Sequence, residues 1–248
     1  MKRQPFEAHD VKGGELWTTE AELPAMQALG LHLQNRWQDY LRAGLAGGRG
    51  RIAIVETRTR RLLLKQLRRG GALRTLWRDR FAGNGRLLAN LTLPFEAIDR
   101  GVSTPPVVAM LLVSGPPGFW RGWLAVELVE HAQDLASQLI DGELTEDHWE
   151  LALQQVRKLH DAGIEHPDLN LGNLMTDQDG AAWIIDLDKA QRRADPLDAG
   201  ARAAGLRRLR RSYRKLCREN GLEPQLTDEW LAWYGADEAI RQSFSSGS

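Results

Sequence analysis

The sequence has 248 residues, of which 42% are hydrophobic and 27% are charged. These values are ordinary for a globular protein and exclude a fibrous or wholly disordered chain. The longest apolar run, residues 107–113, is too short to span a bilayer. The single cysteine, Cys217, excludes an internal disulfide, and the start, MKRQPFEAHD, lacks the apolar core of a signal peptide. We therefore expect a cytoplasmic protein.

The net charge is zero, but basic and acidic residues are unevenly distributed along the chain. Residues 1–125 contain 19 Lys and Arg against 10 Asp and Glu, whereas residues 126–248 contain 14 against 23. Residues 202–218 contain eight basic side chains and no acidic one. Such clusters suit phosphate, nucleic acid or an anionic lipid surface, or they form a solvated helix face. Because no nucleic-acid reader motif accompanies them, we expect no nucleic-acid partner.

The first half is predicted to form a mostly antiparallel sheet of four or five strands with one inserted helix. Residues 28–43 have helical apolar spacing, which a glycine-rich segment over residues 44–50 ends. Residues 70–100 predict a helix interrupted by glycines and by Pro94. Four apolar runs predict strands, the first two of them as a hairpin: residues 51–57, 61–67, 107–113 and 123–129.

The second half is predicted to be mainly helical. Residues 145–163 have the clearest helical pattern of the chain, with an apolar stripe at helical spacing. The DQDG turn joins two strands of a hairpin, residues 174–176 and 182–186. A basic helix over residues 199–218 follows, and residues 241–248 are expected to form a disordered tail.

Three polar side chains of the second half form a pattern typical of phosphoryl transfer. Asp168 and Asn173 lie in the loop HPDLNLGN, and Asp186 ends the apolar strand WIID. The hairpin between them brings Asn173 and Asp186 to one site, where amide and carboxylate oxygens can hold Mg²⁺. Asp168, which comes five residues before Asn173, can then accept a proton from a substrate hydroxyl.

The first half supplies groups that suit nucleotide phosphates. Gly47, Gly48 and Gly50 precede a strand, and backbone amides of glycines can approach phosphates closely. Lys65 lies in the run RLLLKQL, where its ammonium can pair with the same phosphates. The alternatives are a flexible connector for the glycines and a solvated strand lysine for Lys65. The pattern in the second half is therefore the more specific indication.

The segments LHDAGIEHPDLNLGNLMTDQDGAAWIIDLDKAQ and LLLKQLRRGG resemble the lipopolysaccharide core kinases of the protein-kinase-like superfamily. Within that family the resemblance is greatest to kinases of 3-deoxy-D-manno-octulosonic acid (Kdo). It implies a bilobal α+β fold, with an antiparallel sheet lobe followed by a mainly helical lobe. The nucleotide-binding lobe would cover residues 1–130, including a helical extension over residues 1–43, and the catalytic lobe residues 131–240.

The resemblance also implies an activity and a site. ATP and Mg²⁺ would serve to phosphorylate a Kdo hydroxyl on a lipid A precursor, at the cytoplasmic face of the inner membrane. Asp168 would be the catalytic base, Asn173 and Asp186 the metal ligands, and His166 an organiser of the loop. Lys65 would bind phosphates, as would the glycine-rich segment. The residues implied as nucleotide-binding are Gly47, Gly48, Gly50, Lys65 and the hinge residues Glu127 and Val129.

The sequence departs from the kinase pattern at several places. The helix glutamate that usually pairs with the strand lysine is missing, because Asn90 falls at its expected position and Glu96 is the nearest acidic residue. The metal motif reads DLD, so Asp188 is either a second ligand or a loop-stabilising carboxylate. The segment after Asp186 is too short for a peptide-binding activation segment, which favours a small or lipid-linked acceptor.

Two other functions stay open from the sequence. One is a kinase of the same fold for heptose, an aminoglycoside or a protein, and the other is a catalytically weak kinase-fold scaffold. For a lipid-linked acceptor, the basic helix over residues 199–218 would face anionic headgroups and give peripheral membrane contact. Phe119, Trp120 and Trp123, which flank Arg121, fit either a membrane interface or core packing.

Overall fold

A computed structural model describes residues 5–47, 50–68, 79–116, 118–193, 195–226 and 229–246. The chain divides into two units. The first comprises Met1–Phe95 and Pro105–Leu128, and the second comprises Glu96–Thr104 and Val129–Ser248. The second unit thus includes Glu96–Thr104. The lobe boundary expected from the sequence, between residues 130 and 131, would place this segment in the first lobe.

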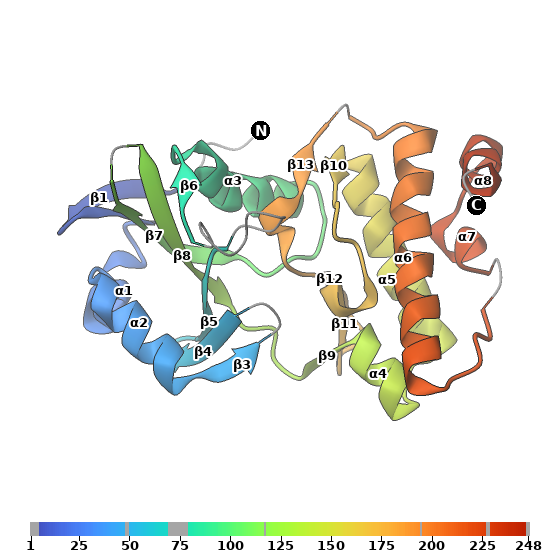
Figure 1. The fold of residues 1–248 in the computed structure, drawn as a ribbon, viewed down its shortest axis with the longest axis horizontal. Helices are drawn as coiled ribbons and strands as arrows, with labels where there is room; N and C mark the ends of the chain where they lie inside the picture. Colours follow the sequence, from blue (N-terminus) through green and yellow to red (C-terminus); the bar gives the residue numbers. More distant parts are fainter. Residues whose placement is uncertain are drawn as a thin grey trace. The chain divides into compact units, whose positions relative to one another are not determined.

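An antiparallel sheet of eight strands forms the centre of the first unit (Figure 1). Its strands are β1 (Glu7–Val11), β2 (Gly14–Thr18), β3 (Leu45–Gly47), β4 (Gly50–Glu56), β5 (Arg61–Gln66), β6 (Phe81–Ala82), β7 (Val107–Ser114) and β8 (Phe119–Glu127). Their order is β1-β2-β7-β8-β5-β4-β3, and β6 pairs with β8. The four predicted strands form β4, β5, β7 and β8. The sheet is larger than predicted because the added strands are short or mostly polar.

The expected helical extension over residues 1–43 is wrong for its first part. The hairpin β1-β2 precedes the two helices of this segment, α1 (Leu23–Ala28) and α2 (Gln34–Ala43). The helical spacing of residues 28–43 also does not produce one helix. Gly30 adopts a φ of 74°, a left-handed conformation that suits glycine, and it ends α1.

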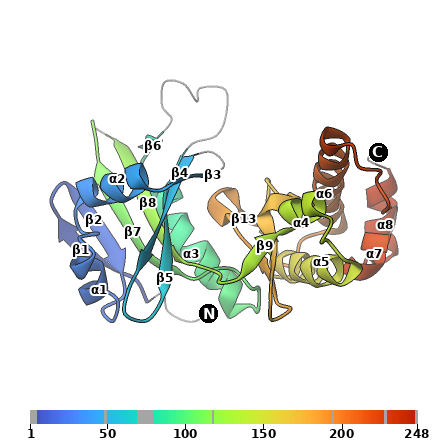
Figure 2. The same cartoon turned by 90° about the horizontal axis from the view of Figure 1, so that it is seen from below.

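Helices cover both faces of the sheet. Leu111 of β7 packs with Trp37 of α2 on one face, whereas its neighbour Leu112 packs with Leu87 of α3 (Gly85–Asp99) on the other. Helix α3 therefore lies on the opposite side of the strands from α1 and α2 (Figure 2). Because successive side chains of a strand point to opposite faces, this double coverage explains the uninterrupted apolar run of β7.

The second unit is mainly helical, as predicted (Figure 1). Its helices are α4 (Leu135–Asp141), α5 (Glu146–Asp161), α6 (Ala199–Asn220), α7 (Glu229–Tyr234) and α8 (Glu238–Ser245). Its strands are β9 (Ala132–Asp134), β10 (Ile164–Glu165), β11 (Leu174–Asp177), β12 (Ala182–Ile184) and β13 (Gln191–Arg192). Strands β12, β11 and β9 form one small sheet, and β10 pairs with β13. Helix α7 packs along α5, and α8 packs along α6.

Helix α5 forms where its cap and apolar stripe predict it. The Thr145 hydroxyl accepts a hydrogen bond from the His148 backbone N–H at 3.3 Å, which satisfies a donor of the first turn. Trp149 on the apolar stripe meets Tyr213 of α6 and Trp230 of α7 edge to face, with ring centroids 5.6 and 5.8 Å away. This aromatic cluster joins the three helices.

The expected disordered tail over residues 241–248 is wrong for its described part. Asp237 caps α8 by accepting from the Ile240 backbone N–H at 2.9 Å. Ile240 and Phe244, one helical turn apart, are both buried, and the Arg210 guanidinium lies 4.3 Å from the centroid of the Phe244 ring. The serines and glycine of this segment made a tail the simpler prediction, because only two large apolar residues indicate a helix. Residues 247–248 lie outside the described residues.

Helix α6 has an inward and an outward set of basic residues. Arg202 pairs with Asp161 at 2.7 Å, Arg208 pairs with Glu165 at 3.4 Å, and Arg207 donates to the Ser243 carbonyl. The outward set is exposed and comprises Arg211, Arg214, Lys215 and Arg218. Within the described ranges, neither this helix nor any other is long and apolar enough to cross a membrane.

A buried polar network joins α5, α6 and α7. His160 Nδ1 is hydrogen-bonded to the Tyr234 hydroxyl at 2.8 Å, and Arg202 Nη1 donates to the same hydroxyl at 3.3 Å. The Tyr234 hydroxyl accepts from Arg202, and the tautomer of the imidazole decides which atom donates in its bond to Nδ1. Burial lowers the pKa of His160 to about 3 and raises the pKa of Tyr234 to about 12.

We expect the free energy of unfolding to decrease on acidification below pH 6.5. His160 takes up a proton near pH 6.5 in the unfolded chain but only near pH 3 in the folded one. The unfolded state therefore binds the proton first, and each such group contributes a loss of about 1.4 kcal/mol per pH unit across that window. Urea unfolding of the wild type and of His160→Gln between pH 7 and 4 measures the free energy of unfolding as a function of pH. An equal pH dependence of this free energy in the two proteins would contradict the role of His160.

Candidate active site

The loop after β10 is held by bonds to the backbone of Asp168. The side-chain amides of Asn173 and Asn170 donate to the Asp168 carbonyl at 2.8 and 2.7 Å. The Asn173 backbone N–H also donates to the Asn170 carbonyl at 3.1 Å and closes the 3₁₀ turn η1 (Leu171–Asn173). The loop geometry thus depends on the backbone of Asp168, whereas its side chain is 32% exposed.

His166 connects this loop to the segment that leads to Asp186. Its Nδ1 accepts from the Asp168 backbone N–H at 3.2 Å, and its Nε2 donates to the Ile185 carbonyl at 3.4 Å. This arrangement needs a neutral ring with the proton on Nε2. Burial lowers the pKa of His166, which favours the neutral ring. These contacts are those expected of a residue that organises the loop.

The hairpin β11-β12 brings Asn173 beside the residues that precede Asp186. Leu174 pairs with Ile184, and the Ile185 backbone N–H donates to the Asn173 carbonyl at 2.9 Å. Asp186 then adopts φ 59° and ψ 50°, a left-handed conformation that is uncommon in residues other than glycine. Such backbone strain is often found at functional sites, where the surrounding structure maintains it.

The donors near Asp186 fit a magnesium ion. The Nδ2 of Asn173 is bonded to the Asp168 carbonyl, so Oδ1 is the end of the amide suited to a cation. Asp186 supplies an exposed carboxylate. One or two protein oxygens, with phosphate and water completing the shell, are the usual ligands of Mg²⁺. Asp188, in the 3₁₀ turn η2 (Leu187–Lys189), is partly exposed and lies two residues further along.

One contact of the site was not predicted from the sequence. The Lys189 ammonium donates to Asp168 Oδ2 at 3.0 Å. The signal in the sequence is a lysine three residues after Asp186, in DLDK, at the end of the short turn η2. The pattern of phosphoryl-transfer residues contains no lysine at that spacing, so sequence reasoning did not single it out.

Lys65 lies in the middle of the first unit's sheet. It stands on β5 between Ile52 of β4 and Leu124 of β8, which are its two partners in register. Its predicted place on a strand is confirmed. The identification of Lys65 as a phosphate-binding lysine stays a prediction.

The two residues considered as partners of Lys65 make other contacts. The Asn90 amide donates to the carbonyls of Arg86 and Leu87 at 3.0 and 3.1 Å, and its buried Oδ1 has no hydrogen-bond partner within the described part of the chain. The Glu96 carboxylate accepts from Arg192 at 3.3 Å. Helix α3 continues past Pro94 to Asp99. The predicted interruption of the helix at Pro94 is therefore wrong.

The glycine-rich segment forms part of a hairpin rather than a free loop. Gly47 of β3 pairs with Gly50 of β4, and Gly48 lies outside the described residues. A Cβ at Gly44 would lie 2.0 Å from the Ile52 carbonyl oxygen, so a close approach of two backbones requires that glycine. At least one glycine of the segment therefore has a structural role.

The predicted hinge lies where the two units divide in the sequence. Glu127 ends β8, and its backbone N–H donates to the Pro106 carbonyl at 2.9 Å. Its carboxylate accepts from Arg60 at 2.9 Å, so the side chain belongs to the surface of the first unit. Val129 is the first residue of the following segment of the second unit. Adenine binding by this backbone stays a prediction.

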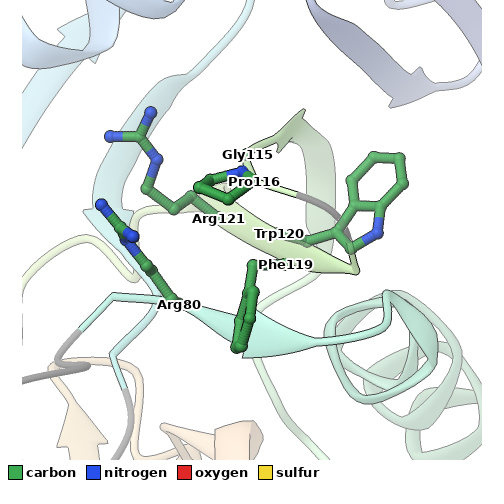
Figure 3. Close-up of a pocket in the computed structure, with 6 residues that line it drawn as sticks. All are labelled: Arg80, Gly115, Pro116, Phe119, Trp120 and Arg121. Atoms are coloured by element: carbon green, nitrogen blue, oxygen red, sulfur yellow. The ribbon is translucent and has the colours of Figure 1, made fainter.

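A small pocket lies at the end of the β7-β8 hairpin (Figure 3). It is lined by Arg80, Gly115, Pro116, Phe119, Trp120 and Arg121. Its volume of about 30 Å³ exceeds the roughly 10–15 Å³ that one water molecule needs, so the pocket has room for a few water molecules. Trp123, considered for a membrane interface, is buried in the core, whereas Trp120 is partly exposed.

Comparisons with known proteins agree with this architecture. Residues 34–232 match the lipopolysaccharide kinase (Kdo/WaaP) family. A protein of Xylella fastidiosa (strain 9a5c) named 3-deoxy-D-manno-octulosonic acid kinase is 32% identical over 204 residues, which are 80% of this chain and 80% of the relative. A protein of the same name from Xanthomonas oryzae pv. oryzae (strain PXO99A) is 35% identical over 187 residues, with 73% and 72% covered.

A solved structure has the same fold. The structure titled "WaaP in complex with acyl carrier protein" superposes with a TM-score of 0.52 over 93% of this chain and 98% of that chain, at 18% identity. The predicted α+β kinase-like fold is thereby confirmed. Since both the family match and the relatives extend over most of the sequence, the chain belongs to the lipopolysaccharide kinase (Kdo/WaaP) family.

Proposed function

We propose that this chain is an ATP-dependent kinase that phosphorylates a Kdo hydroxyl on a lipid A precursor. Membership of the Kdo/WaaP family and relatives named Kdo kinase support the reaction class and the acceptor sugar. The observation that carries the proposal is the joining of Asp168, Asn173 and the segment before Asp186 by hydrogen bonds within one unit. A base and two oxygen donors are the parts that phosphoryl transfer needs from a protein.

Asp168 acts as the base of the proposed reaction. The acceptor hydroxyl oxygen forms a bond to the γ-phosphorus of ATP, the bond from that phosphorus to the β–γ bridging oxygen breaks, and ADP leaves. The hydroxyl proton passes to the Asp168 carboxylate. The hydrogen bonds to the Asp168 backbone hold the loop while the partly exposed carboxylate takes part in the chemistry.

Asn173 and Asp186 would hold Mg²⁺ through amide and carboxylate oxygens. The ion, when bound, would neutralise negative charge on the phosphates. Lys65 would add a second positive charge at the phosphates, and the backbone at Gly47 and Gly50 would approach them. The backbone of Glu127 and Val129 would contact adenine. These nucleotide roles rest on the resemblance to protein-kinase-like enzymes.

Phosphate transfer measured on a panel of acceptors tests the proposed function. The purified chain, radiolabelled ATP and Mg²⁺ are incubated with lipid A precursors that carry Kdo, with matched precursors that lack Kdo, and with heptose, an aminoglycoside and a protein. We expect label only in the Kdo-bearing precursors. Label found only in Kdo-free acceptors would contradict the assignment of Kdo as the acceptor sugar. No transfer to any acceptor would contradict the kinase activity.

We also propose peripheral contact with an anionic membrane through the outward set of α6. Arg211, Arg214 and Arg218 recur at i, i+3 and i+7, so they share one exposed face of the helix. A basic residue near an anionic lipid surface contributes about 1 kcal/mol. This contact would favour the reaction of a lipid-linked acceptor, because the enzyme and its substrate would then be held at the same membrane surface.

Neutralising this face is expected to weaken membrane binding by about 10²-fold, the combined effect of three such residues. Sedimentation with phosphatidylglycerol vesicles compares the wild type with the triple variant Arg211→Gln, Arg214→Gln and Arg218→Gln. A control with the same charge change replaces three exposed basic residues of the first unit, Lys12, Arg42 and Arg58. Equal binding of the two triple variants would exclude α6 as the membrane face.

A further inference from the structure

A cation lies beside the proposed base. Lys189 Nζ is 3.0 Å from Asp168 Oδ2, and the side chains of the pair are 27% and 32% exposed. Both residues belong to the second unit, so the contact is set by the packing of that unit alone. The pair is open enough to meet a substrate and buried enough to be held in one geometry.

The local backbone brings Lys189 to this place. Asp186 in its left-handed conformation redirects the chain into the turn η2, and the Ala190 backbone N–H closes that turn by donating to the Leu187 carbonyl at 2.9 Å. Leu187 is buried and fixes the turn to the core. Lys189 is therefore held over the loop by the same turn that begins at the proposed metal ligand.

The catalytic loop itself supplies no comparable cation. Residues 166–173 read HPDLNLGN, which contains no lysine or arginine, and the His166 ring is buried and neutral. Asn170, two residues after Asp168, bonds through its amide to the Asp168 backbone. The positive charge found beside the carboxylate comes instead from Lys189, in another segment.

We propose that Lys189 is a positioning residue, which holds the Asp168 carboxylate in the orientation that meets the acceptor hydroxyl. This inference rests on the proposed role of Asp168 as the base. A partly exposed ion pair contributes little to stability. Orientation of a reacting group, in contrast, has large effects on rate, since a displacement of about 1 Å can cost about 10²-fold. The consequence of the contact is therefore expected in kcat rather than in folding.

Replacing Lys189 by Met keeps an unbranched side chain, one heavy atom shorter, and removes its charge. We expect Lys189→Met to lower kcat for the Kdo acceptor by about 10- to 100-fold. The KM for ATP and the thermal unfolding midpoint are expected to stay close to the wild type. Lys189→Arg, which keeps the charge, should recover kcat several-fold above Lys189→Met. The control Lys158→Met removes an exposed lysine of α5 in the same unit, and it should leave kcat unchanged.

A double-mutant cycle separates this inference from the proposed function. In an Asp168→Asn background, Lys189→Met is expected to change the residual kcat by less than about twofold, because the carboxylate it positions is gone. A loss as large as that in the wild-type background, or a wild-type kcat for Lys189→Met, would overturn the role of Lys189. Wild-type transfer by Asp168→Asn alone would instead overturn the proposed base.

Discussion

Asp168→Asn is expected to lower kcat for phosphate transfer by about 10²- to 10⁴-fold, the usual contribution of a general base. Asparagine has the shape of aspartate but cannot accept the hydroxyl proton at neutral pH. The loop should persist in the variant, since the hydrogen bonds of Asp168 with His166, Asn170 and Asn173 all involve its backbone. Steady-state kinetics with the Kdo-bearing acceptor measure kcat, and calorimetric titration with ATP measures nucleotide affinity, which should hardly change.

A matched control exists in the nearby hairpin. Asp179 lies exposed in the turn between β11 and β12, and Asp179→Asn removes the same charge without touching the loop. This variant should transfer phosphate at the wild-type rate. If Asp168→Asn did so as well, the carboxylate of Asp168 would have no part in the chemistry, and another group would have to receive the proton.

Asp186→Asn is expected to lower kcat by about 10²- to 10³-fold, the range for loss of one preorganised electrostatic group. The folded structure should be unaffected, because asparagine tolerates the left-handed backbone of this position nearly as well as aspartate. Replacement of a carboxylate by an amide weakens the hold on Mg²⁺. Activity measured against Mg²⁺ concentration should therefore shift to higher concentrations. An unchanged magnesium profile and kcat would contradict the role of Asp186 as a metal ligand.

Comparison of Asp186→Ala with Asp186→Asn separates the effect of losing the carboxylate from the cost of the left-handed backbone. Alanine costs about 1–2 kcal/mol in a left-handed conformation, so this variant should be less stable than Asp186→Asn while losing activity to a similar degree. Chemical denaturation compares the two variants. Equal stabilities would mean that the surrounding structure does not maintain the unusual conformation of Asp186.

The elements that could be predicted are those with strong periodicity or clear ends. Helix α5 has both a cap and an apolar stripe, and β7 is apolar throughout because both of its faces are covered. The hairpin β1-β2 has few apolar residues, so its strands leave no clear alternation in the sequence. Helix α8 depends on two apolar residues among serines and glycine, a pattern too short to predict a helix by itself.

The site divides in the same way. The links among Asp168, Asn173 and the residue before Asp186 were predictable because one loop and one hairpin join them, whereas their roles stay a proposal. The link from Lys189 to Asp168 joins residues 21 positions apart and depends on the left-handed turn at Asp186, which no sequence pattern encodes. The partner of Glu96 was equally hidden, because Arg192 is 96 positions away in the sequence.

The left-handed backbone at Asp186 has a consequence for inheritance. Aspartate codons differ by a single base from codons of asparagine and of glycine, the two other residues that adopt this conformation readily. Given the proposed role of Asp186, one nucleotide change at this codon should therefore yield a folded variant of low activity. Lineages in which the modification of the sugar is dispensable should accumulate such variants, with the fold retained and the proposed metal ligand lost.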